Sequence, residues 1–286
     1  MKKTLVITAF NRPALIRDCL ESCLSLENLD EYRIVIVHQK GNLEVEKIIA
    51  EYAQLFSTFV STKPSGSETD AFITNNRILG LYVGFEFWKS EFVVSIEDDV
   101  VLAPDALKFI EHAFKTYRKN LNFRGVNLGS KLPLLEVEPN SYSHLRFGIH
   151  GPASMITKKT WKRINPQRVM SNASINFDAQ IEFALKSGFM VTPNASRYID
   201  QGVEGSHTGN GTDDSYFQGL KMSFVGGGEK SNILNTYFRK DLLPNWRKDC
   251  VIYKPKDNLK YFLKSKFYWV LLKFPKTLQL LNRKVK

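Results

Sequence analysis

Three consecutive carboxylates, Glu97-Asp98-Asp99, have the residue types and spacing that point most directly to chemistry in this 286-residue chain. They follow the apolar run 92–96 and precede a second apolar stretch, 100–104. Adjacent carboxylates repel one another and lose solvation, so a fold tolerates them mainly where a cation or hydrogen-bond donors offset the charge. A solvated surface turn is the alternative, which the apolar flanks disfavour. Because Mg²⁺ and Mn²⁺ prefer oxygen ligands and commonly bind substrate phosphates as well, the cluster predicts a divalent metal site.

The elements before this cluster alternate between strand and helix. Apolar runs predict strands, and apolar residues at helical spacing predict helices. The expected strands span 5–10, 32–38, 58–61 and 91–96, and the expected helices span 13–26, 43–56 and 69–89. This alternation predicts an α/β fold with a mostly parallel sheet and helices on both of its faces. Ligands of such sheets gather beyond the carboxyl ends of the strands, so the carboxylates are expected at the active edge.

The chain beyond the cluster contains further elements. Helical spacing recurs at 104–119 and 177–186, a short strand is expected at 126–128, and a glycine-containing segment spans 147–156. The run 203–214 is rich in Gly, Ser and Thr, which predicts a mobile loop.

The run 92–105 resembles the strand and metal motif of GT-A glycosyltransferases, especially the N-acetylglucosaminyltransferase I type and family 2-like bacterial enzymes. Their motif is also an acidic triplet followed by an apolar stretch and Pro-Asp. The likeness continues in order through Asn11-Arg12-Pro13, Asn75-Asn76-Arg77, a glycine-containing segment ending near Trp161, an Asp before a helix, and a Gly-Ser-His loop. It covers residues 4–211 in outline. The resemblance implies a GT-A (Rossmann-like) fold that binds a nucleotide-sugar.

Matching positions imply roles for the three carboxylates. Asp99 would bind Mn²⁺ or Mg²⁺ directly, while Glu97 and Asp98 would hydrogen-bond the sugar and ribose hydroxyls of the donor. A metal at Asp99 would offset the negative charge that develops on the departing diphosphate.

The resemblance also implies a catalytic base and a loop ligand. Asp178 would be the base of an inverting transfer and would take the proton from the acceptor hydroxyl. The family's doubled acidic pair is missing here, so Glu182 remains a rival base, and helix capping is the other role open to Asp178. His207 would bind the metal or the pyrophosphate from a closing loop; an exposed histidine without a task is its alternative.

The remaining donor contacts are expected near the first strand and before the acidic strand. The guanidinium groups of Arg12 and Arg77 suit a nucleotide or its phosphates, and surface salt bridges are the ordinary alternative for both residues. The residues expected to bind the donor, besides Glu97 and Asp98, are Thr8, Ala9, Asn11, Arg12 and Arg77.

The net charge of +11 belongs mainly to the end of the chain. Residues 254–286 hold ten basic residues and one acidic residue, which leaves 30 basic against 28 acidic in the rest. Lysines interleaved with aromatic residues in this tail predict a basic amphipathic helix on an anionic membrane surface, with docking on the protein's own core as the alternative. Three cysteines without framework spacing and the lack of a signal peptide predict a cytoplasmic protein.

These features predict a metal-dependent, inverting glycosyltransferase of surface polysaccharide synthesis. It would move a sugar from a nucleotide-sugar, which we expect to be a UDP-sugar, to a glycan or lipid-linked acceptor. We expect a catalytic domain at 1–225, with a nucleotide-sugar-binding half at 1–103 and an acceptor-binding half at 104–225, and an extension at 226–286. A nucleotidyltransferase is the alternative enzyme class, but a glycine-rich phosphate loop is missing near the start. The interpretation as a nucleic-acid-binding protein would depend on the charge of the tail alone.

Overall fold

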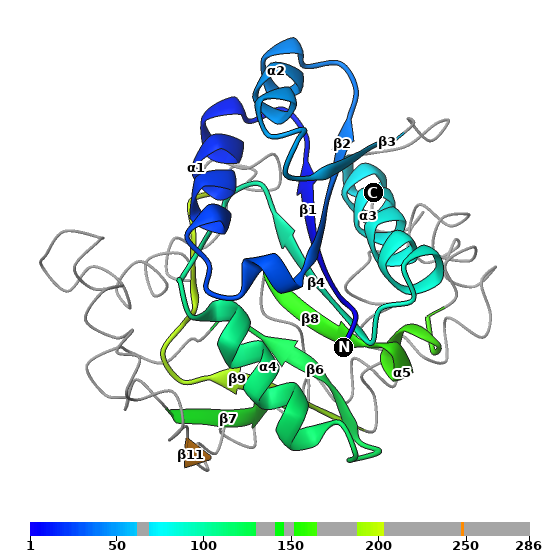
Figure 1. Ribbon diagram of the computed structural model, residues 1–286, viewed down its shortest axis with the longest axis vertical. Helices are drawn as coiled ribbons and strands as arrows, with labels where there is room; N and C mark the ends of the chain where they lie inside the picture. The colour runs from blue at the N-terminus through cyan, green and yellow to red at the C-terminus, as the bar shows by residue number, and fades with distance from the viewer. Residues whose placement is uncertain (62–68, 130–140, 146–151, 165–187, 203–246, 249–286) are drawn as a thin grey trace, which may run out of the picture.

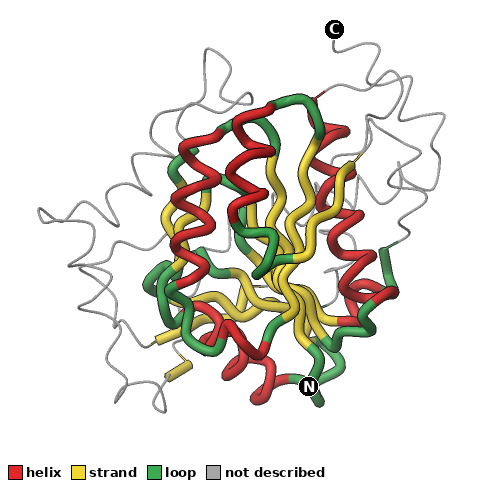
Figure 2. Tube along the Cα trace, turned by 45° about the horizontal axis from the view of Figure 1, so that its top comes forward, coloured by secondary structure: helices red, strands yellow, loops and turns green. Residues whose placement is uncertain are grey.

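The computed structural model describes residues 1–61, 69–129, 141–145, 152–164, 188–202 and 247–248 (Figure 1). Their strands form one nine-stranded sheet, in the order β11-β7-β9-β6-β8-β4-β1-β2-β3, and a separate two-stranded ribbon, β10-β5. Figure 2 shows the strands through the middle of the molecule with helices on either side. The expected α/β architecture is therefore confirmed.

The first half of the sheet is parallel throughout. Strand β1 lies between β2 and β4, and β3 continues the sheet beyond β2. These four strands are β1 (Lys3–Ala9), β2 (Arg33–Gln39), β3 (Ser57–Ser61) and β4 (Phe92–Glu97). Because parallel strands share one direction, the carboxyl ends of β1 and β4 lie side by side, with Thr8 opposite Glu97.

The second half of the sheet is mixed. Strand β8 runs antiparallel to both β4 and β6, β9 runs parallel to β6, and β7 runs antiparallel to β9. The bounds are β6 (Phe123–Asn127), β7 (Ser141–Leu145), β8 (Ser154–Thr157), β9 (Phe189–Pro193) and β11 (Arg247–Lys248). The sheet is mostly parallel, as expected, since β1, β2, β3 and β4, the pair β6 and β9, and the pair β7 and β11 are all parallel.

Helices cover both faces of the sheet. Those described are α1 (Pro13–Leu24), α2 (Leu43–Glu51), α3 (Thr69–Tyr82), α4 (Ala106–Tyr117) and α5 (Lys158–Trp161), with short turns at η1 (Leu29–Glu31) and η2 (Val83–Phe87). Pro13 occupies the first turn of α1, where a missing N–H costs nothing. The Asn42 side chain accepts hydrogen bonds from the backbone N–H groups of Glu44 and Val45, both at 3.1 Å, and so begins α2.

Two predicted helices end several residues earlier in the structure, and the first of them, expected at 43–56, ends at Glu51. The α-helix expected at 69–89 ends at Tyr82 and continues as a π-helical turn, η2. Lys89 then adopts a left-handed backbone angle, φ 58°, which stops helical growth before β4.

The core is divided by the sheet into two layers, because successive side chains of a strand point to opposite faces. On β1, Leu5 and Ile7 join the layer beneath α1, α2 and α4, whereas Val6 joins the layer beneath α3. Side chains of this size contribute about 1.5–3 kcal/mol each when fully buried. Covering both faces explains why β1, β2 and β4 read as continuous apolar runs.

Two further expectations concern residues of the same core and the tail. Cys19 and Cys23 are buried in α1 and form no disulfide, as expected for small core residues. Within the described ranges, no helix combines the length and apolar character needed to cross a bilayer. The basic tail at 254–286 lies outside those ranges.

Candidate active site

The acidic triplet lies where β4 ends, beside the loop that follows β1 (Figure 1). The parallel pairing of the two strands brings Arg12 and the triplet together although they are far apart in the sequence. Asp98 and Asp99 are 2% and 7% exposed, so this is a buried acidic cluster and not a solvated turn.

Arg12 forms a fork across two of the carboxylates. One guanidinium nitrogen, Nη1, donates to Asp99 Oδ2 at 2.6 Å, and the other, Nη2, donates to Asp98 Oδ1. Asp98 Oδ2 also accepts from the backbone N–H of Phe10 at 3.0 Å. Planar, two-pronged donation of this kind is the geometry at which arginine is strongest.

Burial and charge oppose each other in this cluster. Burial raises the pKa of Asp98, and the charge of Arg12 offsets only part of that increase. Burial lowers the pKa of Arg12, but the charges of Asp98 and Asp99 outweigh it, so the net shift of the Arg12 pKa is upward. The arrangement holds negative charge in a place where solvent does not stabilise it.

Glu97 points into a separate ion pair. Arg77, which is 3% exposed on α3, donates through Nη1 to Glu97 Oε1 at 3.1 Å. Arg77 therefore forms the salt bridge that the sequence left open as its alternative role. The pair has one charge of each sign, unlike the group around Arg12, and a role for either residue at the donor stays a prediction.

The other residues predicted at the donor lie on β1 and just beyond it. Thr8 is buried, and its hydroxyl donates to the Ile96 carbonyl at 3.2 Å. Ala9 is buried at the end of the strand, and Asn11 is exposed. Thr8 and Ala9 therefore present little more than backbone and small atoms at this edge, and their contact with a donor stays a prediction.

A carboxylate that the sequence did not single out, Asp200, lies beside the triplet. It ends β10 (Tyr198–Asp200), which pairs antiparallel with β5 (Val100–Leu102) so that Asp200 lies opposite Val100. The Gln201 N–H donates to the Asp99 carbonyl at 2.8 Å, which holds the chain after β10 against the cluster. Burial raises the pKa of Asp200 to about 6, and the charge of Asp99 adds to this shift.

Gly202 leaves room for the two carboxylates to approach. A methyl group added at this glycine would lie 3.0 Å from Asp99 Cγ and 3.1 Å from Asp200 Oδ1, and would overlap Asp99 Oδ2. Both side chains thus border one small volume, and no larger residue fits there without displacing one of them.

The donor set fits a hard divalent cation. Asp98 and Asp99 pair with one guanidinium and Asp200 lies beside them, which leaves two negative charges unbalanced among the described residues. Asp99 Oδ1 is buried and has no hydrogen-bond partner in the described part of the chain. Those parts contain no ready-made group of three His, Cys, Asp or Glu ligands. One or two carboxylates with waters and a phosphate is the usual arrangement for Mg²⁺ and Mn²⁺, so the residues suit such an ion.

Three residues predicted at the site lie outside the described residues. They are the candidate bases Asp178 and Glu182 and the loop residue His207. Their roles stay predictions.

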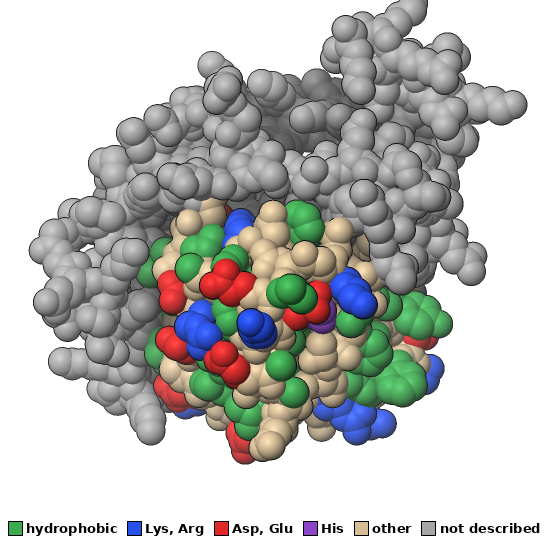
Figure 3. Space-filling view, turned by 90° about the horizontal axis from the view of Figure 1, so that it is seen from above, with side chains coloured by type: hydrophobic (Ala, Val, Ile, Leu, Met, Phe, Trp, Pro, Cys, Tyr) green, Lys and Arg blue, Asp and Glu red, His purple; other side chains and the backbone are tan. Residues whose placement is uncertain are grey.

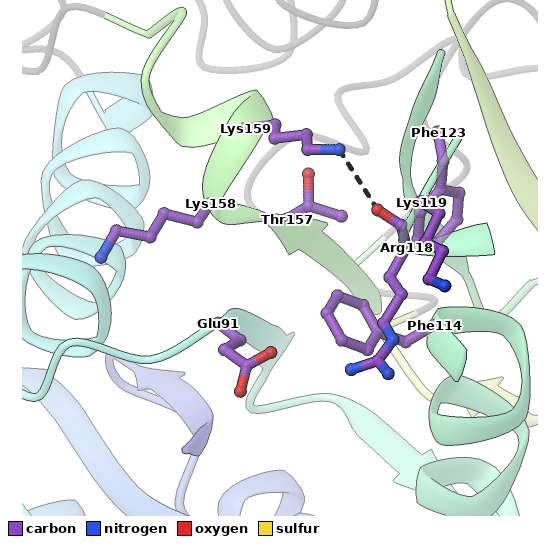
Figure 4. Close-up of a pocket in the computed structure, with 8 residues that line it drawn as sticks. All are labelled: Glu91, Phe114, Arg118, Lys119, Phe123, Thr157, Lys158 and Lys159. Atoms are coloured by element: carbon purple, nitrogen blue, oxygen red, sulfur yellow. Dashed lines mark hydrogen bonds between the residues drawn. The ribbon is translucent and has the colours of Figure 1, made fainter. Parts of the chain in front are cut away.

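A cavity of about 360 Å³ lies at the opposite end of β4 (Figure 4). Phe114 and Phe123 form its floor, and Arg118, Lys159 and Glu91 stand at its rim. Lys159 Nζ donates to the Arg118 carbonyl at 3.2 Å across this rim. No residue predicted at the active site contributes to this cavity, so it is separate from the carboxylate cluster.

Charges on the described surface are mixed. Seen from above, acidic and basic side chains alternate on the described part of this face, and no patch of one sign dominates it (Figure 3). Such mixing agrees with the nearly neutral composition outside the tail.

The part of the chain that forms β1 to β6 matches a known family. Residues 4–126 fit the model described as glycosyl transferase family 2. That match covers less than half of the chain and is with a family of glycosyltransferases, the enzyme class that the sequence predicts. The matched glycosyltransferase segment contains Arg12 and the whole acidic triplet and ends before Asp200.

Comparisons with whole proteins give distant similarities. A search of curated proteins gave no significant match. The structure of Staphylococcus aureus (S. aureus) TarS 1–349 has a TM-score of 0.46 and 15% identity, over 69% of this chain and 59% of that one. The same TarS fragment with UDP-GlcNAc has a TM-score of 0.48 and 12% identity, over 83% and 71%. Mannosyltransferase PcManGT from Pyrobaculum calidifontis, in complex with GDP-Man and Mn²⁺, has a TM-score of 0.45 and 12% identity, over 96% and 88%. The chain therefore spans 59% of the length of the first of these proteins.

Proposed function

We propose that this chain is a metal-dependent glycosyltransferase, which transfers a sugar from a nucleotide-sugar, a UDP-sugar by preference, to a hydroxyl of a glycan or lipid-linked acceptor. The observation that carries the proposal is the excess of buried carboxylates over cations at the end of β4, within the segment that matches the family. A fold stabilises such an excess of buried negative charge poorly on its own, whereas a divalent cation that also binds a diphosphate would offset it.

The residues at the carboxyl ends of β1 and β4 would have different roles. Asp99 would hold the metal, and Asp98 and Glu97 would orient the donor's ribose and sugar hydroxyls. Arg12 lies close enough to this cluster to exchange its carboxylate partners for a diphosphate oxygen, which a guanidinium binds in the same forked geometry. A bound Mn²⁺ or Mg²⁺ supplies Lewis-acid stabilisation of the charge that develops on the leaving diphosphate.

The acceptor side of the proposal depends on residues beyond the described ranges. Asp178 would accept the proton from the acceptor hydroxyl during an inverting attack, with Glu182 as the rival. His207 would join the metal or the pyrophosphate. We also retain the division into a catalytic domain, 1–225, and an extension, 226–286, whose basic tail would attach the enzyme to an anionic membrane surface in polysaccharide synthesis.

Product analysis of a donor panel tests the function. The purified chain is incubated with UDP-, GDP- and dTDP-sugars, with Mn²⁺ or with EDTA, and the released nucleotide is identified. We expect release of a nucleoside diphosphate from one class of donor, with Mn²⁺ and not with EDTA. The same panel with nucleoside triphosphates and sugar phosphates tests the alternative enzyme class, because a nucleotidyltransferase releases pyrophosphate.

The outcomes separate the two enzyme classes. Pyrophosphate release without diphosphate release would replace the glycosyltransferase proposal by the nucleotidyltransferase. Equal diphosphate release in Mn²⁺ and in EDTA would retain the sugar transfer and overturn its dependence on metal.

A further inference from the structure

The antiparallel ribbon of β5 and β10 brings a distant part of the chain to the acidic triplet. Val100 immediately follows the triplet, and its partner in the ribbon is Asp200. The ribbon is held at its other end by the Ala103 N–H, which donates to the Arg197 carbonyl at 3.0 Å. A side chain at the end of β10 is therefore fixed beside Asp99 by backbone pairing.

We infer that Asp200 is a second carboxylate ligand of the divalent cation, beside Asp99. This inference rests on the proposed function and adds to it a residue from outside the family-matched segment. Two carboxylates would bind the cation before the nucleotide arrives, whereas one alone would depend on the diphosphate for most of the affinity.

Three observations carry the inference. Asp99 Oδ2 and Asp200 Oδ1 both lie so close to Gly202 that a methyl group there would meet both of them, which places the two carboxylates next to each other. Asp99 Oδ1 is buried without a hydrogen-bond partner among the described residues, in a side chain whose other oxygen is held by Arg12. Among the described residues, the nearby charges leave an excess of two negative charges, which a divalent cation would neutralise.

The local turn allows a clean substitution. Asp200 Oδ1 accepts from the Gly202 N–H at 2.9 Å, and this contact turns the chain past the cluster. The amide oxygen of asparagine accepts the same bond without carrying a charge. Asp200→Asn thus keeps the turn and removes the ligand charge.

Binding of Mn²⁺ alone to the full chain tests the inference. Free Mn²⁺ is followed by electron paramagnetic resonance during titration of wild type, Asp200→Asn, Asp99→Asn and the matched control Asp18→Asn, whose carboxylate is exposed on α1. We expect one site in wild type and in the control, and a Kd at least about tenfold weaker in Asp200→Asn. Circular dichroism verifies that each variant is folded. If Asp200→Asn fails to fold, Asp200→Glu replaces it, and the displaced carboxylate is expected to weaken binding as well.

The outcomes distinguish this inference from the function on which it rests. Wild-type affinity in folded Asp200→Asn, with weakened binding in Asp99→Asn, would overturn the role of Asp200 and leave the proposed function intact. Wild-type affinity in both variants would overturn the metal site at Asp99 as well. A wild-type chain that binds no Mn²⁺ alone, yet releases diphosphate only with Mn²⁺, would overturn the inference alone.

Discussion

Two arginines of this fold face carboxylates in different proportions. Arg197 is fully buried, and its Nε donates to Asp105 Oδ2 at 3.1 Å, so one cation meets one anion among the ion pairs of the described residues. Arg12 is partly exposed and meets Asp98 and Asp99, with Asp200 beside them. The first is a balanced pair and the second has an excess of negative charge.

The difference separates a structural role from a ligand-binding one. The Arg197 backbone N–H donates to the Leu128 carbonyl at 2.8 Å, and its partner Asp105 stands at the start of α4. Arg197 therefore ties together the residue before β10, the residue after β6 and the start of α4. Around Arg12 the carboxylates outnumber the cations of the described residues, and a divalent cation that also binds a diphosphate would offset this excess of negative charge.

Loss of the balanced pair should have the largest effect on stability. Arg197→Met leaves Asp105 buried without its partner, and we expect the free energy of unfolding to fall by about 3–5 kcal/mol, measured by urea denaturation. The control Arg17→Met breaks the exposed pair with Glu51 and should leave the free energy of unfolding nearly unchanged, because solvent screens that pair. Equal losses in the two variants would remove the structural role of Arg197.

Loss of Arg12 should have a smaller effect that Mn²⁺ reverses. Arg12→Gln leaves two carboxylates without their cation, and we expect the free energy of unfolding in EDTA to fall by about 1–3 kcal/mol. Mn²⁺ should stabilise this variant more than it stabilises wild type, since the guanidinium no longer competes for the carboxylates. An equal or smaller Mn²⁺ effect in the variant would show that the guanidinium and the ion do not share this site.

The sequence predicted the parallel half of the sheet because its strands are covered on both faces. The apolar runs of β1, β2 and β4 follow directly from that burial, and the place of Glu97, Asp98 and Asp99 follows from the direction of β4. The mixed half was harder, since β8 has four residues and overlaps the glycine-containing segment 147–156, for which no strand was predicted.

Asp200 was missed for a related reason. Its strand, β10, has three residues, and its partner lies about a hundred positions earlier in the sequence. No periodic pattern connects two such short segments. The available signal was a carboxylate that closes a short apolar run before a glycine, as the triplet closes a longer one.

A side chain at Gly202 should weaken metal binding with little effect on the fold. Gly202→Ala places a methyl group against Asp99 Oδ2, so the carboxylate or the chain after β10 must move. We expect a change of less than about 1 kcal/mol in the free energy of unfolding in EDTA, and a smaller rise in melting temperature with Mn²⁺ than in wild type.

A control glycine separates strain from site geometry. Gly41 has a φ of 127°, so Gly41→Ala strains the backbone at a position where the added methyl group meets no neighbouring atom within 4 Å, and it should lower the melting temperature without changing the Mn²⁺ effect. A full Mn²⁺ effect in Gly202→Ala would contradict the close approach of Asp99 and Asp200 to that position.

The smallest effect is expected at His112, on the side of α4. Burial lowers the pKa of His112, and the charge of Lys115 lowers it further. Below pH 6.5 the unfolded chain takes up a proton that the folded chain resists, so the free energy of unfolding decreases as the pH falls from 7.5 toward 5.5. His112→Gln should make this decrease shallower in urea titrations at the two pH values. An unchanged slope would show that His112 does not contribute to it.

Transfer by Asp99→Asn tests the central claim most directly. Diphosphate release from the preferred donor is measured at saturating Mn²⁺ for wild type, Asp99→Asn and the control Asp18→Asn, together with each melting temperature in EDTA. We expect a rate at least about 100-fold lower in Asp99→Asn, with a melting temperature that is unchanged or raised, and a wild-type rate in Asp18→Asn. A folded Asp99→Asn enzyme that releases diphosphate at the wild-type rate would contradict the central claim.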